Sequence, residues 1–456
     1  MGFTLEQVNK TLGLINWNNC IFQELFFKRV CIDSRDLKPD DLFIAIKGTR
    51  YDGHDFIYEA ISKGAKAVVL NKDVQTYPEK FPYWEVPNTI IAFQQLALFK
   101  RKELNIPVIA ITGSVGKTTT KEMAGSVLGK FGKVKISKEN FNNEIGVALT
   151  ILSCDERDKL LVLEMGMRGL GQIENLSKFS EPNIAIITNI GTSHIGILGS
   201  KFNIAKAKCE ITSHLKKNGT LIIPSDNKFL DQNLKDLWNG RIVRVKLLSI
   251  HEINKFRLPQ ENEVLGFYDS SNNNIKIDNK DFQITFKGRH NAKNFLCVYA
   301  LARELGMEFE AYNNFDFIGL KGRNRIVKKE KVTILDETYN ASPESVMACI
   351  DVLINFPGRH FLILGSIKEL GEKTIKYHLE LMDFIEKSNL DGFIFLCEED
   401  LEKKLKKSYI FKKEISFVRD IDQIGFIVNR WLNYGDYLLI KGSRYWKLEK
   451  LISQIN

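Results

Sequence analysis

Apolar runs of strand length alternate with helix-length segments through the middle of the chain. One such run, residues 106–111, ends in a glycine-rich turn, and others follow at 160–167, 184–191 and 220–226. A helical pattern lies between them, for example near residues 172–179. Strands this apolar, alternating with helices, indicate a parallel sheet that is covered on both faces. We therefore predict a central domain of this type over residues 89–317.

Two further domains are expected on either side of it. Strand-like runs at 332–335, 361–364, 392–396 and 437–440, with helices between them, predict a second parallel, Rossmann-like α/β domain over residues 318–456. The first 88 residues mix helix with short strands, and Pro82, Pro87 and Asn88 indicate a linker after them. The expected fold class is α/β with three domains, 1–88, 89–317 and 318–456.

In the last third of the central domain, the alternation of apolar strands and helices is weaker. Residues 231–287 look less regular, and the short alternation at 274–278 suits antiparallel strands. Gly288 begins a capped helix that runs to about residue 306.

A phosphate-binding loop follows the run at 106–111. Backbone N–H groups of a glycine loop can approach phosphate oxygens closely, and a helix N-terminus adds its dipole to the same anion. Lys117 is placed to reach the β- and γ-phosphates, and the Thr118 hydroxyl is placed to reach Mg²⁺. Ile111 stands where the common motif has a glycine, so the loop is a shorter form. The predicted nucleotide-binding residues of the loop are Gly113, Ser114, Val115, Gly116, Lys117, Thr118 and Thr119.

Three polar residues lie at or just after the ends of predicted parallel strands, where ligands gather in such sheets. Glu164 is either a terminal charge facing water or a Mg²⁺ ligand beside the phosphate loop, and the loop's need for a second oxygen ligand favours the metal. Asn189 and His194 follow the next strand, where His194 is either structural or part of a second metal site. Lys208 lies in a helical stretch and, by composition alone, is a surface lysine.

Three other polar turns have a structural interpretation, and the second and third of them also have a functional one. Asp33, Ser34 and Arg35 fit a turn with a helix cap. Asp336 ends a strand, so it either belongs to a turn or accepts hydrogen bonds from ribose hydroxyls. The segment 441–444 follows the last strand and either binds an anion or forms a turn before a helix.

Composition narrows the class of protein. The chain has 456 residues, 44% of them hydrophobic, a net charge of +9 and seven scattered cysteines without a Cys-x-x-Cys pair. This pattern argues against a disulfide framework and a structural zinc site, and it favours a reducing, cytoplasmic location. No apolar run reaches the ~20 residues of a membrane span. The charge suits anionic small molecules, and no aromatic-basic interleaving supports nucleic-acid binding.

Taken together and in order, these motifs resemble the Mur ligases, the ATP-dependent amide-forming enzymes of peptidoglycan assembly. The segments that carry the resemblance are 33–35 with 52–54, 112–120, 140–146, 164–167, 189–194 with 199–200, 205–211, 288–294, 322–323, 336 with 339–343, 365 with 369–371, and 441–444. Segments 140–146 and 339–343 are similar to the member that adds D-alanyl-D-alanine. The Asp-Asn-Pro-Arg motif expected of the member that adds the third residue is absent.

The resemblance implies a role for each matching residue. Lys117 would hold the ATP phosphates, Thr118 and Glu164 would ligate one Mg²⁺, and His194 and Lys208 would serve a second, with Lys208 carbamylated by CO₂. Asn294, Arg323 and Asp336 would contact the nucleotide. The implied substrate-binding residues are Ser34, Arg35, Asn142, Asn143, Tyr339 and Asn340.

The implied reaction joins D-alanyl-D-alanine to UDP-N-acetylmuramoyl-tripeptide through an acyl phosphate, in a cytoplasmic monomer. Val115, Arg325 and Ser366 depart from the family at variable positions. Two alternatives stay open: a sister ligase that adds a single amino acid, and a P-loop protein that binds ATP without catalysis.

Overall fold

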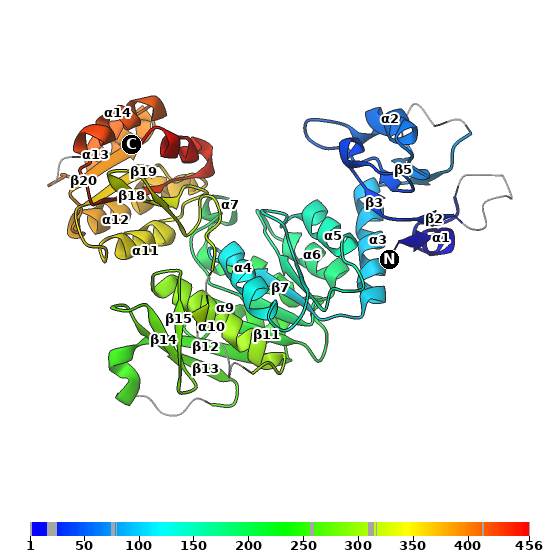
Figure 1. Ribbon diagram of the computed structural model, residues 1–456, viewed down its shortest axis with the longest axis horizontal. Coiled ribbons are helices and arrows are strands. Elements are labelled where there is room, and N and C mark those ends of the chain that lie inside the picture. Colours follow the sequence, from blue (N-terminus) through cyan, green and yellow to red (C-terminus); the bar gives the residue numbers. More distant parts are fainter. Residues whose placement is uncertain are drawn as a thin grey trace.

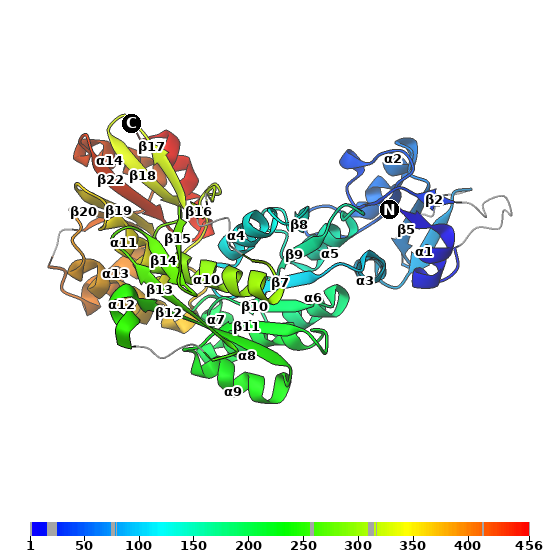
Figure 2. The same ribbon diagram turned by 60° about the horizontal axis from the view of Figure 1, so that its bottom comes forward.

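The computed structural model describes residues 2–15, 25–73, 78, 80–255, 260–308, 314–315, 317–412 and 415–455. The chain forms three domains in a row, and the N-terminal and C-terminal domains lie at opposite ends of the central one (Figure 1 and Figure 2). No sheet of the described residues is shared between two domains. The predicted α/β class with three domains is confirmed.

The N-terminal domain holds a two-stranded antiparallel sheet and a four-stranded parallel one. Its elements are β1 (Phe3–Thr4), α1 (Leu5–Leu12), β2 (Phe26–Phe27), β3 (Val30–Cys31), η1 (Ser34–Asp36), β4 (Leu42–Ile44), η2 (Gly53–Phe56), α2 (Ile57–Ser62), β5 (Ala67–Asn71) and β6 (Tyr83–Val86). The Asn88 side chain then accepts hydrogen bonds from the N–H groups of Ile90 and Ile91 and so caps helix α3 (Thr89–Leu104), which leads into the central domain.

The central sheet has ten strands in the order β16-β15-β14-β13-β12-β11-β10-β7-β9-β8. Its elements are β7 (Val108–Thr112), α4 (Lys117–Leu128), β8 (Val134–Ile136), α5 (Glu144–Leu152), β9 (Leu160–Glu164), α6 (Gln172–Ser180), β10 (Ile184–Ile187), α7 (Ile195–Leu198), α8 (Lys201–Cys209), η3 (Glu210–Thr212), β11 (Thr220–Pro224), α9 (Lys228–Leu237), β12 (Arg241–Ser249), η4 (Ile250–Lys255), β13 (Glu263–Asp269), β14 (Asn274–Ile277), β15 (Lys280–Ile284), α10 (Arg289–Glu304) and β16 (Asn314–Phe315).

Helices cover both faces of this sheet, as predicted. Ile109 and Ile111 of β7 face a core that includes residues of α4 and α10, whereas Val108 and Ala110 face the opposite core, which includes residues of α3, α5 and α6. Side chains of a strand point alternately to the two faces. A strand buried in this way has no polar face, which explains the uninterrupted apolar runs.

The prediction for residues 231–287 was only partly right. Antiparallel pairing of β14 with β13 and β15 is confirmed. The segment also contains helix α9 and β12, which pairs in parallel with β11 and β13. In β12 alternate residues are more exposed, so this strand lacks the continuous apolar run of a strand buried on both faces.

The C-terminal domain has a six-stranded sheet in the order β17-β18-β22-β19-β20-β21, parallel except for β17. Its elements are β17 (Arg325–Lys328), β18 (Val332–Glu337), α11 (Pro343–Leu353), β19 (His360–Gly365), η5 (Gly371–Lys373), α12 (Thr374–Lys387), β20 (Gly392–Leu396), α13 (Glu399–Ser408), β21 (Ser416–Val418), α14 (Ile421–Trp431), β22 (Asp436–Lys441), η6 (Arg444–Trp446) and η7 (Leu448–Ser453). The four predicted strands correspond to β18, β19, β20 and β22.

Cysteines 31, 154, 209, 297, 349 and 397 are buried and free, which agrees with the prediction against a disulfide framework, and Cys20 lies outside the described residues. None of the helices in the described part of the chain combines the length and the apolar character that crossing a bilayer requires.

A buried histidine in the C-terminal domain predicts a pH-dependent stability. His378 accepts a hydrogen bond from Ile367 N–H at Nε2, 3.1 Å away, and its Nδ1 lies 2.7 Å from the Thr374 carbonyl oxygen. Burial lowers the His378 pKa from 6.5 to about 4. Between these values the unfolded chain binds a proton that the folded protein does not, so the free energy of unfolding falls as pH drops from 6.5 towards 4. From this group alone we expect a loss of about 2 kcal/mol at pH 5.

Urea unfolding of the wild type and of His378→Gln at pH 7 and pH 5 checks this. The wild type should lose about 2 kcal/mol more than the variant between the two pH values. An equal loss in both proteins would contradict the assignment.

Candidate active site

The phosphate loop joins β7 to the N-terminus of α4, as predicted. Gly113 and Gly116 have φ values of 155° and 82°. A Cβ on Gly113 would collide with Thr188 Oγ1, and one on Gly116 would lie 2.7 Å from Asn294 Oδ1. Both positions therefore need glycine for space as well as for backbone conformation. Asn294, which the resemblance assigns to the nucleotide, thus packs directly against the loop.

The end of β10 holds the loop in shape. The Asn189 side chain accepts a hydrogen bond from Val115 N–H at 3.1 Å and donates one to the Val115 carbonyl oxygen at 2.8 Å. Ser114 Oγ accepts a hydrogen bond from Gly191 N–H at 2.8 Å. Asn189, the polar residue at this strand end, therefore fixes the backbone of Val115. Val115 lines the cavity described below.

Lys117 curls back over the loop. Its Nζ donates to the carbonyl oxygens of Gly113, at 2.8 Å, and Ser114, at 3.4 Å. Burial lowers the pKa of Lys117, and the nearby Glu164 carboxylate opposes that effect. A cation whose present partners are neutral carbonyl groups is available to a phosphate that enters the loop.

The two predicted oxygen ligands of Mg²⁺, Thr118 and Glu164, lie close to Lys117. Thr118 Oγ1 donates to Glu164 Oε2 at 2.8 Å, and Asn142 Nδ2 donates to Glu164 Oε1 at 2.8 Å. Glu164 is buried, so the interpretation as a water-facing charge is wrong. Mg²⁺ binds through one or two carboxylates completed by water and substrate phosphates, and this hydroxyl–carboxylate pair fits that pattern. Within the described residues no group of three or more His, Cys, Asp or Glu side chains forms a metal cage.

Lys208 is not the surface lysine that composition suggested. It lies in α8 and is 1% exposed, and its side chain forms no hydrogen bond or ion pair within the described part of the chain. Burial, with the charge of Lys117 as a second cause, moves the Lys208 pKa well below its usual value. Burial therefore favours the uncharged amine form of this side chain.

His194 lies between the central and C-terminal domains. It precedes α7 with φ of 64°, and its Nδ1 lies 2.7 Å from Glu369 Oε2. The structure pairs His194 with a carboxylate of the C-terminal domain, and its service at a second metal stays a prediction.

A cavity of about 340 Å³ opens between the phosphate loop and the C-terminal domain. Arg323 stacks on the Tyr339 ring at 3.9 Å, and Asn324 Nδ2 donates to Thr119 Oγ1 at 3.2 Å across the domain boundary. The predicted residues that line the cavity are Ser114, Val115, Gly116, Lys117, Thr119, Asn294, Arg323, Tyr339 and Asn340. Lys441 of the anion-binding candidate segment lines it too, and its Nζ donates to the Asn340 carbonyl oxygen at 3.1 Å.

Asp336 does not line the cavity; it lies behind the residues that do. Its fully buried carboxylate accepts hydrogen bonds from Gly322 N–H at 3.0 Å and from the Thr338 hydroxyl at 2.7 Å. These bonds shape the turn that presents Arg323. The structure thus shows the turn interpretation directly, and a ribose contact by Asp336 stays a prediction.

The remaining predicted substrate residues lie away from the cavity. Asp33 caps η1 and is paired with Arg35 at 2.6 Å, while Ser34 is buried, all in the N-terminal domain. Asn143 caps α5 by accepting a hydrogen bond from Gly146 N–H at 2.8 Å. The helix-cap interpretation of residues 33–35 is confirmed, and their contact with a substrate stays a prediction.

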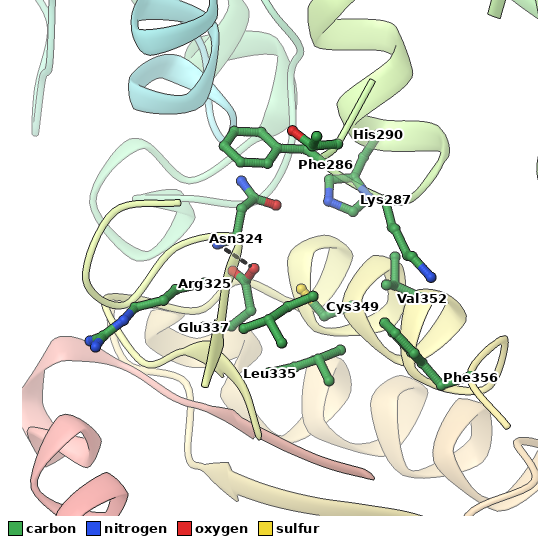
Figure 3. Close-up of a pocket in the computed structure, with 12 residues that line it drawn as sticks. Phe286, Lys287, His290, Asn324, Arg325, Leu335, Glu337, Cys349, Val352 and Phe356 are labelled. Atoms are coloured by element: carbon green, nitrogen blue, oxygen red, sulfur yellow. Dashed lines mark hydrogen bonds between the residues drawn. The ribbon is translucent and has the colours of Figure 1, made fainter. Parts of the chain in front are cut away.

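Sequence reasoning missed several residues of the cavity wall. Asn291, Lys293, Asn324, Glu337 and Glu344 all line it. In the sequence these residues lie close to Asn294, Arg323 and Asp336 or just after 339–343. That proximity could have identified them as candidates for the same site. A smaller hollow of about 50 Å³ adjoins the cavity between the same two domains, with His290, Asn324, Glu337 and Cys349 bordering both (Figure 3).

Family models match successive parts of the chain. They are the Mur ligase family, catalytic domain, over residues 27–118, the Mur ligase middle domain over 111–302, and the Mur ligase, glutamate ligase domain, over 322–444. The chain belongs to the Mur ligase family, as its motifs predicted.

Two individual relatives within this family carry the same name. A protein of Synechocystis sp. named UDP-N-acetylmuramoyl-tripeptide–D-alanyl-D-alanine ligase is 36% identical over 436 residues, covering 95% of this chain and 93% of that one. A Bacillus subtilis protein of the same name is 33% identical over 462 residues, covering 99% and 96%.

Solved structures agree with these relatives. MurF from Acinetobacter baumannii has a TM-score of 0.86 and 26% identity, with coverage of 100% of this chain and 99% of that one. MurF ligase from Thermotoga maritima, in complex with ADP, has a TM-score of 0.81 and 27% identity, with coverage of 93% and 96%.

Proposed function

We propose that this protein uses ATP to join D-alanyl-D-alanine to the C-terminal carboxylate of UDP-N-acetylmuramoyl-tripeptide. The observation that carries the proposal is the phosphate loop with Lys117, beside the buried Thr118–Glu164 pair, at a cavity closed by a second domain. The whole-chain similarity to proteins named for this reaction supports the choice of substrates.

The proposed reaction has two steps. The tripeptide carboxylate attacks the γ-phosphorus of ATP, the bond to ADP breaks, and an acyl phosphate forms. The amine of D-alanyl-D-alanine then attacks the acyl carbon, loses a proton, and displaces inorganic phosphate. Lys117 and the α4 N-terminus would stabilise the negative charge that spreads over the transferred phosphoryl group. Mg²⁺, when bound at Thr118 and Glu164, would neutralise further charge on the phosphate oxygens.

The C-terminal domain supplies the rest of the site. Arg323 and Lys441 face the cavity from the side opposite the loop and would bind the nucleotide or the phosphorylated intermediate. A site closed by two domains excludes water, which would otherwise hydrolyse the acyl phosphate. The N-terminal domain would hold the UDP end of the substrate.

We further propose that Lys208 is carbamylated. An uncharged lysine amine adds to CO₂ and releases one proton, which gives an N-carboxylate. The burial of Lys208, its lowered pKa and its lack of a polar partner among the described residues support this. The product would place an anionic oxygen ligand near Lys117, suited to a second Mg²⁺ with His194.

A ligation assay tests the proposed function. Purified protein receives ATP, Mg²⁺ and UDP-N-acetylmuramoyl-tripeptide, with lysine or diaminopimelate as the third residue, and phosphate release is followed with different amine acceptors. We expect release and a pentapeptide product with D-alanyl-D-alanine, and at most background release with single amino acids. A preference for a single amino acid would identify a sister ligase, and ATP binding without product would identify a non-catalytic protein.

A further inference from the structure

Lys121 is a buried cation on the helix that follows the phosphate loop. Helix α4 lies against β8 and β9, and Lys121 is one turn further along it than Thr118 (Figure 2). Its side chain is fully buried, and lysines are almost never buried without partners. Three acceptors surround its Nζ: the Ser137 carbonyl oxygen at 2.6 Å, Glu122 Oε1 at 2.9 Å and the Glu139 carbonyl oxygen at 3.3 Å. They match the three donors of an ammonium group.

One of these acceptors lies at the point where β8 ends. The ladder between β8 and β9 continues one residue beyond β8, since Ser137 N–H donates to the Val162 carbonyl oxygen at 3.0 Å. In a regular parallel ladder, the next bond would run from Glu164 N–H to the Ser137 carbonyl oxygen. Here Lys121 binds that carbonyl oxygen, and Glu164 N–H donates to Ser137 Oγ at 3.2 Å instead. Lys121 therefore draws the chain away from the strand at this residue.

The segment 137–142 then contacts Glu164 a second time. Glu139, the other backbone partner of Lys121, has φ of 41°, a left-handed conformation that the surrounding structure must hold in place. Residues 138–140 are exposed, so packing does little to hold them. Asn142 Nδ2 donates to Glu164 Oε1 at 2.8 Å. The segment thus holds both the backbone and the carboxylate of Glu164.

We propose that Lys121 is a positioning residue for Glu164. Its ammonium group fixes the carbonyl oxygens of Ser137 and Glu139. The segment that contains them fixes Glu164 through the Ser137 hydroxyl and the Asn142 amide. Groups that orient a metal ligand typically change metal affinity by about 10- to 100-fold when they are removed. This inference rests on the proposed function for the assignment of Glu164 as a Mg²⁺ ligand.

The arrangement ties both predicted ligands of this Mg²⁺ to one helix. Thr118 belongs to the first turn of α4, and Glu164 is held by the segment that Lys121 of the same helix anchors. Residues three apart on a helix lie on the same face. A lysine that only joined α4 to β8 would affect the stability of the domain and leave its dependence on Mg²⁺ unchanged. The dependence on the metal therefore separates the two roles.

Two variants test the two links separately. Lys121→Met keeps a long side chain and removes the ammonium group, whereas Ser137→Ala keeps the carbonyl oxygen and removes the hydroxyl. Mn²⁺ titrated in the presence of a non-hydrolysable ATP analogue, and followed by electron paramagnetic resonance, should bind about tenfold more weakly to both variants than to the wild type. In the ligation assay their KM for Mg²⁺ should rise about tenfold, with kcat at saturating Mg²⁺ within about threefold of the wild-type value.

Lys135→Met is the matched control. Lys135 lies in β8, and its Nζ donates to the Ser153 carbonyl oxygen at 2.9 Å. Its removal subtracts the same charge and the same kind of bond from this strand without touching segment 137–142. It should keep the wild-type Mn²⁺ affinity and KM for Mg²⁺. Hydrogen exchange of the metal-free protein, followed by mass spectrometry, should be faster over residues 137–142 in Lys121→Met and unchanged there in Lys135→Met.

The inference is overturned if Lys121→Met binds Mn²⁺ as tightly as Lys135→Met, or if it loses kcat without a rise in KM for Mg²⁺, as loss of folded protein would produce. If Lys121→Met does not fold, Ser137→Ala decides, and a wild-type Mn²⁺ affinity in that variant overturns the inference. Failure of the proposed function is a separate result. In that case wild type and Lys135→Met would both form no ligation product, while the Mn²⁺ titration would still decide the role of Lys121.

Discussion

Replacing Lys117 with alanine should lower kcat by at least about 10³-fold. Lys117 is the cation that touches the loop backbone where the γ-phosphate would sit, and its current partners are two carbonyl oxygens. Removing one group that stabilises a developing anion in a water-excluded site typically costs 10²–10³ in rate, and a charged group on a transferring phosphoryl costs more. Phosphate release in the ligation assay measures the effect.

Lys293→Ala provides the comparison. Lys293 also lines the cavity, but it is paired with Asp226 at 3.1 Å. Its removal subtracts the same formal charge from the cavity, and we expect a loss at least tenfold smaller than that of Lys117→Ala. Equal losses would mean that the net charge of the cavity, not the placement of Lys117, supports the reaction.

Lys208→Ala should lower kcat by about 10²-fold or more. If Lys208 bears a carbamate, the variant lacks the anionic ligand that the carbamate supplies, and high bicarbonate should not restore activity. Wild-type protein equilibrated with ¹³C-bicarbonate should show a carbamate signal by ¹³C NMR that Lys208→Ala lacks.

Lys206→Ala is the matched control for this experiment. Lys206 lies two residues earlier in α8 and is exposed. It should keep both the carbamate signal and turnover. Full activity in Lys208→Ala, or a carbamate signal that persists in it, would refute the assignment.

Local patterns predicted the parts of the site that are built locally. The strand, glycine turn and helix around Gly113 and Lys117 are encoded in consecutive residues, so their structure followed from the sequence. The position of Glu164 at a strand end was also sufficient to place it beside the loop, because the ends of neighbouring parallel strands share one edge of the sheet.

What could not be predicted depends on contacts between distant segments. Lys208 looked like a surface lysine because burial of a helix face is decided by what packs on it. The pairing of His194 with Glu369 joins residues of two domains, and the bonds of Asp336 to the Gly322 turn depend on how β18 meets that turn. Strand β12 was missed because its alternate residues are more exposed, so it carries a weaker apolar signal than a strand buried on both faces.

The buried cysteines give this protein a built-in indicator of unfolding. Burial raises the pKa of Cys154, Cys209 and Cys297 to about 12, and those of Cys349 and Cys397 likewise. Only a thiolate reacts readily with alkylating reagents, so these thiols stay inert in the folded protein at neutral pH. Cys154, Cys209, Cys297 and Cys397 each become reactive when their own domain opens. Because the first three belong to the central domain and Cys397 to the C-terminal one, the order of their alkylation reports which domain opens first, whereas Cys349 borders the cavity between these domains and also responds to their separation.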